Sequence, residues 1–165
     1  MLAADESIPT ASWLAVSYHQ GDDSVAFRAA WVLEYIAVHD PDRFVSVAKT
    51  FLSRLADQKN RSCQRHFTNI LRHLTSPKAP ASYQQVCLST DREQLVETVF
   101  NWFIDPQTPV AIQANCMDIL LNMSSEFNWI KDELKQQIEF LLRDGSAAIQ
   151  SRGKKVLAAL RRSKS

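Results

Sequence analysis

The stretch DSVAFRAAWVLEYIA, residues 23–37, decides the fold class. At about 100° per residue, its apolar side chains surround most of a helix circumference, which predicts a helix covered by neighbours on several sides. Asp22 or Asp23 is a suitable N-cap, and Pro41 follows soon after the predicted end of the helix at His39. The segment therefore predicts a helix that is packed between other helices.

The same helical periodicity runs through nearly the whole chain of 165 residues. It predicts helices over 10–20, 24–39, 42–57, 61–75, 91–105, 109–124, 128–143 and 147–162. The clearest break is Ser76-Pro-Lys-Ala-Pro-Ala81, followed by a short helical turn over 82–88. No stretch shows sustained strand alternation, and only three glycines occur, which excludes a glycine-rich phosphate loop. The sequence predicts an all-α protein.

A repeat is visible at an offset of 37 residues, at which Ala111-Ile112-Gln113 matches Ala148-Ile149-Gln150. At the same offset the apolar positions of 26–37 match those of 63–74. One helical pair cannot bury all of its apolar surface alone, so such units stack in series and share a core. The last helix, 147–162, has a narrow apolar stripe and a charged outer side, which is typical of a terminal capping unit.

At this point the chain resembles the HEAT and armadillo class of α-helical repeats. The likeness is carried by turns followed by the second helix of a pair, at 23–33, 109–120 and 146–157. It covers roughly residues 10–75 and 91–162, departs from the pattern at 76–90, and has Gln113 and Gln150 where an arginine is customary.

The resemblance implies a right-handed α-α superhelix, an ARM-like solenoid of about four stacked antiparallel helix pairs. We expect a single domain over 1–165, with an irregular break at 76–90 and a basic capping helix and tail at 147–165. The resemblance also implies a habit of binding other macromolecules, although such arrays serve many functions.

Charge is strongly segregated although the net charge is only +1. Residues 43–78 hold eight basic residues and one acid, and 152–165 hold six basic residues and no acid. By contrast, 1–42 hold seven acids and one basic residue, and 79–151 hold ten acids and four basic residues. The basic tail would suit nucleic acid or a membrane surface, or it is simply the solvated side of a capping helix.

A candidate binding site follows from the helix at 61–75, where Arg61, Arg65 and Arg72 fall within about 40° of one another. In a HEAT-like array the second helix of each pair usually lines the concave surface. By that analogy Arg28, Trp31 and Tyr35 lie near the basic stripe, and the six residues would hold phosphate, carboxylate or an acidic peptide. The alternative is that both stripes are solvated helix faces, with Trp31 and Tyr35 filling gaps between helices.

No catalytic constellation is recognisable in the sequence. Cys63 and Cys116 lie on apolar faces and are interpreted as core residues, whereas Cys87 is the thiol we expect to be exposed. His66 and His73 are about 10 Å apart along a helix, too far to share a metal directly. We therefore predict that the protein is not an enzyme and uses no metal or cofactor.

The cysteines also bear on the compartment. Their odd number and wide spacing do not suggest a disulfide framework, and no apolar run approaches the roughly 20 residues that span a bilayer. The start of the chain lacks the basic region of a secretory signal. These features predict a cytoplasmic protein with no membrane partner.

The function expected from the sequence is a non-enzymatic interaction or scaffold module of HEAT-like type. Its partner would be another protein, and a second copy of the same chain is one candidate. The alternative is a nucleic-acid-binding protein of the HEAT-like DNA-repair type that uses the basic stripe on its concave surface. The net charge of +1 and the two acidic blocks count against that alternative. A third reading, a regulatory subunit that binds a small anion, has little support.

Overall fold

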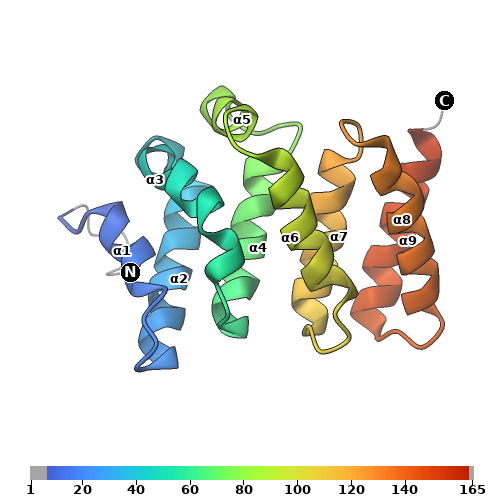
Figure 1. The fold of residues 1–165 in the computed structure, drawn as a ribbon, viewed down its shortest axis with the longest axis horizontal. Coiled ribbons are helices and arrows are strands. Elements are labelled where there is room, and N and C mark those ends of the chain that lie inside the picture. The colour runs from blue at the N-terminus through green and yellow to red at the C-terminus, as the bar shows by residue number, and fades with distance from the viewer. Residues whose placement is uncertain (1–6, 164–165) are drawn as a thin grey trace. The chain divides into compact units, whose positions relative to one another are not determined.

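A computed structural model describes residues 7–163, and over this range the chain forms helices and no strand. The helices are α1 (Thr10–Val16), α2 (Asp23–His39), α3 (Pro41–Ser53), α4 (Arg61–Thr75), α5 (Ala81–Leu88), α6 (Arg92–Ile104), α7 (Val110–Met123), α8 (Asn128–Leu142) and α9 (Ala147–Arg162), with a 3-10 turn, η2 (Leu55–Asp57). Figure 1 shows their order along the chain. The predicted all-α fold class is confirmed.

Two of the predicted helix ranges are wrong, and one contact lies just beyond the end of both helices. The first helix ends at Val16 instead of residue 20, and the third ends at Ser53 before η2 begins. The hydroxyl of Tyr18 donates a 2.8 Å hydrogen bond to the carbonyl oxygen of Arg54. This bond joins the chain just after α1 to the chain just after α3.

The chain divides into two compact units, with the boundary after Leu95. In the first unit, α1, α3 and α5 form one layer, since α3 contacts both of the others. Helices α2 and α4 form the second layer and lie side by side (Figure 1). The core between the layers is aromatic: the Phe51 ring packs against Phe44 and Phe67, with centroids 5.6 and 4.8 Å away.

In the second unit, α7 and α9 lie against each other, and α8 contacts both of them. The ring of Phe100 on α6 lies 5.7 Å from that of Trp129, which brings α6 to α8. The predicted apolar stripe of the last helix is buried here at Ile149, Val156 and Leu160. Each unit is thus a stack of helical pairs built in two layers.

Helix α5 corresponds to the short helical turn expected over 82–88, within the break at 76–90. Pro80 precedes its first residue, and Tyr83 in its first turn is 1% exposed. The Tyr83 hydroxyl donates a 2.6 Å hydrogen bond to the carbonyl oxygen of Ala37 in α2. This contact ties α5 to the rest of the first unit, so residues 81–88 are a packed helix rather than a loop.

A glutamine stands at the fourth position of α4, α7 and α9; it is buried in α4 and α7 and half-buried in α9. Gln64 donates to the carbonyl oxygen of Gln58 at 2.7 Å, Gln113 to that of Phe103 at 3.4 Å, and Gln150 to that of Leu142 at 2.6 Å. In each case the acceptor lies just before the turn into the helix. The glutamines therefore satisfy carbonyl groups that the preceding helix or turn leaves open. Helices α7 and α9 begin at Val110 and Ala147, 37 residues apart, as the repeat predicted.

Candidate binding face on α2 and α4

Three side chains bridge α2 and α4. His66 Nδ1 lies 2.8 Å from Glu34 Oε2, and the Asn69 side-chain amide donates to the other oxygen of Glu34. The Phe27 ring packs against the His66 ring, with centroids 5.1 Å apart. The side chains of His66 and Glu34 are only 13% and 19% exposed. Partial burial makes this bridge stronger than a surface ion pair.

The bridge sets the charge of Glu34. Burial alone would raise the pKa of this carboxyl, but the hydrogen bonds from His66 and Asn69 favour the ionised form, as do the nearby His66 and His73. The net result is a pKa below the ordinary value for glutamate. Glu34 is therefore ionised at neutral pH, and both of its carboxylate oxygens take part in the hydrogen bonds of the bridge.

On α2, the side opposite the core carries Arg28, Trp31 and Tyr35. All three are exposed, with Trp31 at 48% and Tyr35 at 37%. The opposite side of the helix is buried, including Ala26, Ala30, Leu33 and Ala37. Trp31 and Tyr35 therefore lie at the surface and do not fill gaps between helices.

On α4, Arg65 is exposed, whereas Arg61 and Arg72 are half-buried. One guanidinium nitrogen of Arg61 donates to Gln64 Oε1 at 2.9 Å, and one of Arg72 donates to Asn69 Oδ1 at 2.8 Å. The buried side of α4 again lies opposite, at Cys63, Phe67, Ile70 and Leu74. Because α2 and α4 lie side by side, both outward stripes point away from the core on the same side of the first unit.

We call Arg28, Trp31, Tyr35, Arg61, Arg65 and Arg72 the α2–α4 face. The structure brings these six sequence-predicted residues onto adjacent helices of one unit. Asn69 links the two parts of the site, since it donates to Glu34 and accepts from Arg72. Sequence reasoning missed Glu34 as part of the site, and it placed Asn69 near the stripe without giving it a contact. The sequence held one signal for Glu34. Its carboxyl stands between Trp31 and Tyr35 on α2, and the neighbouring helix α4 carries two histidines.

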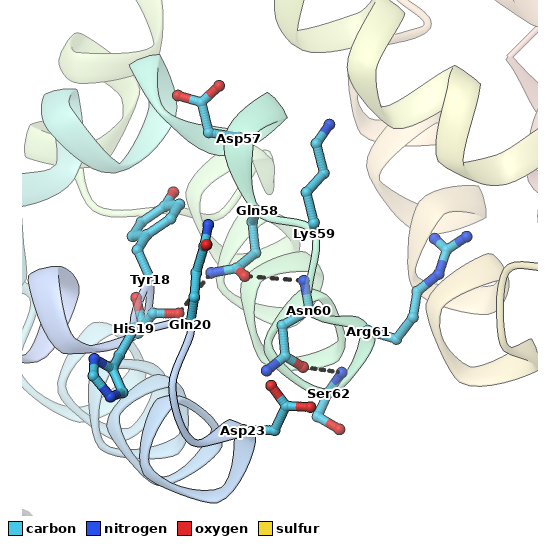
Figure 2. A pocket seen from close by; sticks show the side chains of 11 residues that line it. Tyr18, His19, Gln20, Asp23, Asp57, Gln58, Lys59, Asn60, Arg61 and Ser62 are labelled. Atoms are coloured by element: carbon cyan, nitrogen blue, oxygen red, sulfur yellow. Dashed lines mark hydrogen bonds between the residues drawn. The ribbon is translucent and has the colours of Figure 1, made fainter.

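A polar pocket of about 490 Å³ lies at the beginning of the same two helices. It is lined by residues 17–20, Asp23 and 57–62 (Figure 2). Gln58 Nε2 donates to the carbonyl oxygen of Ser17 at 3.0 Å, and Asn60 Oδ1 accepts from the backbone amide of Ser62 at 2.9 Å. The lining balances the carboxylates of Asp23 and Asp57 with the cations of Lys59 and Arg61. Such a mixed lining has no net preference for ligand charge.

Two of the three cysteines are placed as the sequence predicted, whereas Cys87 is less exposed than expected. Cys63 and Cys116 are buried and Cys87 is half-buried; all three are free thiols. Burial, with a smaller contribution from Asp23, raises the pKa of Cys63 to about 11, and burial raises that of Cys116 further. Both thiols therefore stay protonated and unreactive at neutral pH.

Residues 7–163 hold neither a metal-binding cluster nor a membrane-spanning helix. No group of three or more His, Cys, Asp or Glu side chains in residues 7–163 is placed to hold a metal ion. Every helix within the same range is too short or too polar to cross a lipid bilayer.

With the fold and the face described, the chain can be compared with known proteins. A family model described as a HEAT repeat domain matches residues 14–160, and the chain therefore belongs to this family. The match covers most of the sequence and confirms the resemblance found from the sequence. Comparison with curated proteins and with solved structures gave no match.

Proposed function

We propose that the protein is a non-enzymatic interaction module that binds another protein through the α2–α4 face. Membership of the HEAT repeat family supports an interaction role in general. The particular surface is supported by the placement of its aromatic and arginine side chains on two adjacent helices. Tryptophan, tyrosine and arginine are the residue types that contribute most to protein interfaces.

The exposure of Trp31 carries this proposal. It lies in the middle of α2, a helix whose other side belongs to the core, and almost half of its surface is open to water. Tyr35 lies one turn further along the same side, and its ring packs against His39 with centroids 4.4 Å apart. Large aromatic side chains held in this way offer apolar area to a partner at a small cost in conformational entropy.

The test is site-specific photo-crosslinking in an extract of the native source. A benzophenone amino acid replaces Tyr35 in one variant and Phe140, an exposed aromatic residue on α8, in the control. We expect a protein to crosslink from position 35 and not from position 140, and the Arg28→Glu substitution to abolish the adduct. Equal adducts from both positions, or none from position 35, would refute the proposal.

The second candidate function is nucleic-acid binding. The arginine stripe of α4 next to exposed aromatic residues on α2 favours it, because bases stack on aromatic rings while arginines contact phosphates. Titration with duplex and single-stranded DNA at two salt concentrations tests it. Binding that weakens steeply as salt rises would support nucleic acid, and absence of binding at low salt would exclude it.

We also infer a cytoplasmic location, supported by the three free cysteines, since a reducing compartment preserves thiols. A second copy of the chain remains a candidate for the protein partner. The family match runs through both compact units, which supports the interpretation of 1–165 as one repeat domain.

A further inference from the structure

We infer that the α2–α4 face binds a short acidic peptide segment of the partner, whose carboxylates pair with Arg28 and with the arginines of α4 while an apolar side chain packs on Trp31 and Tyr35. This inference rests on the proposed function, because it names the chemistry of the partner at the same face. It goes beyond that function in committing to the charge and the length of the occupant and to an extended conformation.

The charge of the face is the first step. Of the nine charged residues in 43–78, eight are basic, and Arg61, Arg65 and Arg72 present three of these on one side of α4. Arg28 adds a fourth exposed or half-exposed guanidinium from α2. Glu34 lies between the two stripes, and both of its carboxylate oxygens are engaged in hydrogen bonds with His66 and Asn69. The face therefore presents net positive charge to a partner, and carboxylate is a matching ligand for arginine.

The apolar part is the second step. Trp31 and Tyr35 lie on the same side of α2 as Arg28 and expose 48% and 37% of their surface. A strictly polar ligand would leave this apolar area in water, whereas an aliphatic or aromatic side chain would cover it. The complementary segment therefore carries both acidic and apolar residues.

The extent of the face is the third step. Arg28 to Tyr35 spans about 10 Å of helix, and Arg61 to Arg72 about 16 Å. An extended segment of about five residues covers the longer distance. Carboxylates stand beyond both ends of the α2 stripe, with Asp22 and Asp23 before it and Asp40 after it. These acids repel a polyanion that continues past the face, which favours a short peptide over a nucleic-acid strand.

The rigidity of the arginine stripe is the fourth step. The chain of hydrogen bonds from Glu34 through Asn69 to Arg72 joins α2 to the guanidinium and fixes its orientation. Arg61 is oriented in the same way by Gln64, which is itself anchored on the Gln58 carbonyl. Side chains held in place before binding lose less entropy when a carboxylate arrives.

The experiment is selection from a displayed library of random 12-residue peptides on the full-length protein. The enriched peptides are resynthesised with a fluorophore, and their affinities are measured by anisotropy for the wild type and for three variants. Arg28→Glu and Trp31→Ala alter the face, and Lys49→Glu is a charge-matched control on the exposed side of α3. A single-stranded oligothymidine of 12 nucleotides is titrated in parallel.

We expect the enriched peptides to carry at least two carboxylates and an apolar residue within about five positions. Their affinity should fall about tenfold or more in Arg28→Glu and in Trp31→Ala, stay unchanged in Lys49→Glu, and weaken as salt rises. Enrichment of neutral or basic peptides, no enrichment at all, equal binding by the face variants, or binding of the oligothymidine alone would each overturn the inference. If crosslinking from position 35 still identifies a protein in that case, the proposed function stands and only the acidic segment is wrong.

Discussion

His66 Nδ1 lies 2.8 Å from Glu34 Oε2, and this pair joins the two helices that carry the candidate binding face. The residues are 32 positions apart in sequence, so the contact exists only because α2 and α4 lie side by side. The Asn69 amide donates a hydrogen bond to the same carboxylate, and its oxygen accepts one from Arg72. One acid thus contributes both to the stacking of the helices and to the geometry of the arginine stripe.

Replacing Glu34 with alanine should destabilise the protein. The substitution removes the acceptor of two hydrogen bonds and leaves polar groups of His66 and Asn69 partly buried without it. We expect the free energy of unfolding to fall by about 1–3 kcal/mol, measured by urea titration. Glu133→Ala, at an exposed position of α8, is the matched control and should change stability by less than about 0.5 kcal/mol. Equal effects of the two substitutions would contradict the structural role of the bridge.

The carboxyl of Glu34 should also make the free energy of unfolding depend on pH in the acidic range. The pKa of Glu34 is lower in the folded protein than its ordinary value of 4.5, so unfolding takes up a proton as the pH falls through this range. The stability that Glu34 contributes is fully present above pH 4.5 and is lost as the pH falls through the lower folded pKa. Urea midpoints at pH 7, 5, 4 and 3 should therefore decrease less in Glu34→Gln than in the wild type. A parallel decrease in both proteins would assign the acid sensitivity to other carboxyls.

The three thiols should differ in reactivity. Cys87 is half-buried, whereas Cys63 and Cys116 are fully buried with raised pKa values. With Ellman's reagent at pH 8, one thiol per chain should react in the native protein and three after unfolding. Cys87→Ser should abolish the native reaction. A reactive thiol that persists in that variant would be Cys63 or Cys116, and it would show that α4 or α7 opens readily.

Gly153 lies where α9 packs tightly against α8. A Cβ atom at this position would lie 3.1 Å from both Ile138 Cγ2 and Leu142 Cδ2. Gly153→Leu should destabilise the protein by about 1–3 kcal/mol, because the added side chain overpacks this contact. The control is Ser151→Leu at an exposed position of the same helix. Differential scanning calorimetry compares the thermal stability of the two variants. A Gly153→Leu variant as stable as the control would mean that α8 and α9 are loosely packed.

The sequence predicted most of the fold because apolar periodicity and caps are local signals. Asp22, for instance, accepts from the backbone amide of Ser24, as an N-cap should, and α2 begins at the next residue. The ends of α1 and α3 could not be predicted in this way. Just beyond both ends, a hydrogen bond joins Tyr18 to Arg54, and a contact between residues 36 positions apart leaves no local signal in the sequence.

The candidate site was predictable in part for the same reason. Arg61, Arg65 and Arg72 share a side of α4 by helix geometry alone, and Trp31 and Tyr35 share a side of α2. Whether those sides face water was open until the exposure of Trp31 was known. The bridge through Glu34 and Asn69 depends on the register between two stacked helices, which periodicity does not fix.

The central claim is that the α2–α4 face is where a protein partner binds. The most direct measurement is calorimetric titration of the purified crosslinked partner into the wild type, Arg28→Glu and Lys49→Glu, with the thermal midpoint of each recorded. The account predicts that Arg28→Glu loses about tenfold or more in affinity at an unchanged thermal midpoint, whereas Lys49→Glu binds as the wild type does. Unchanged affinity in Arg28→Glu would contradict it.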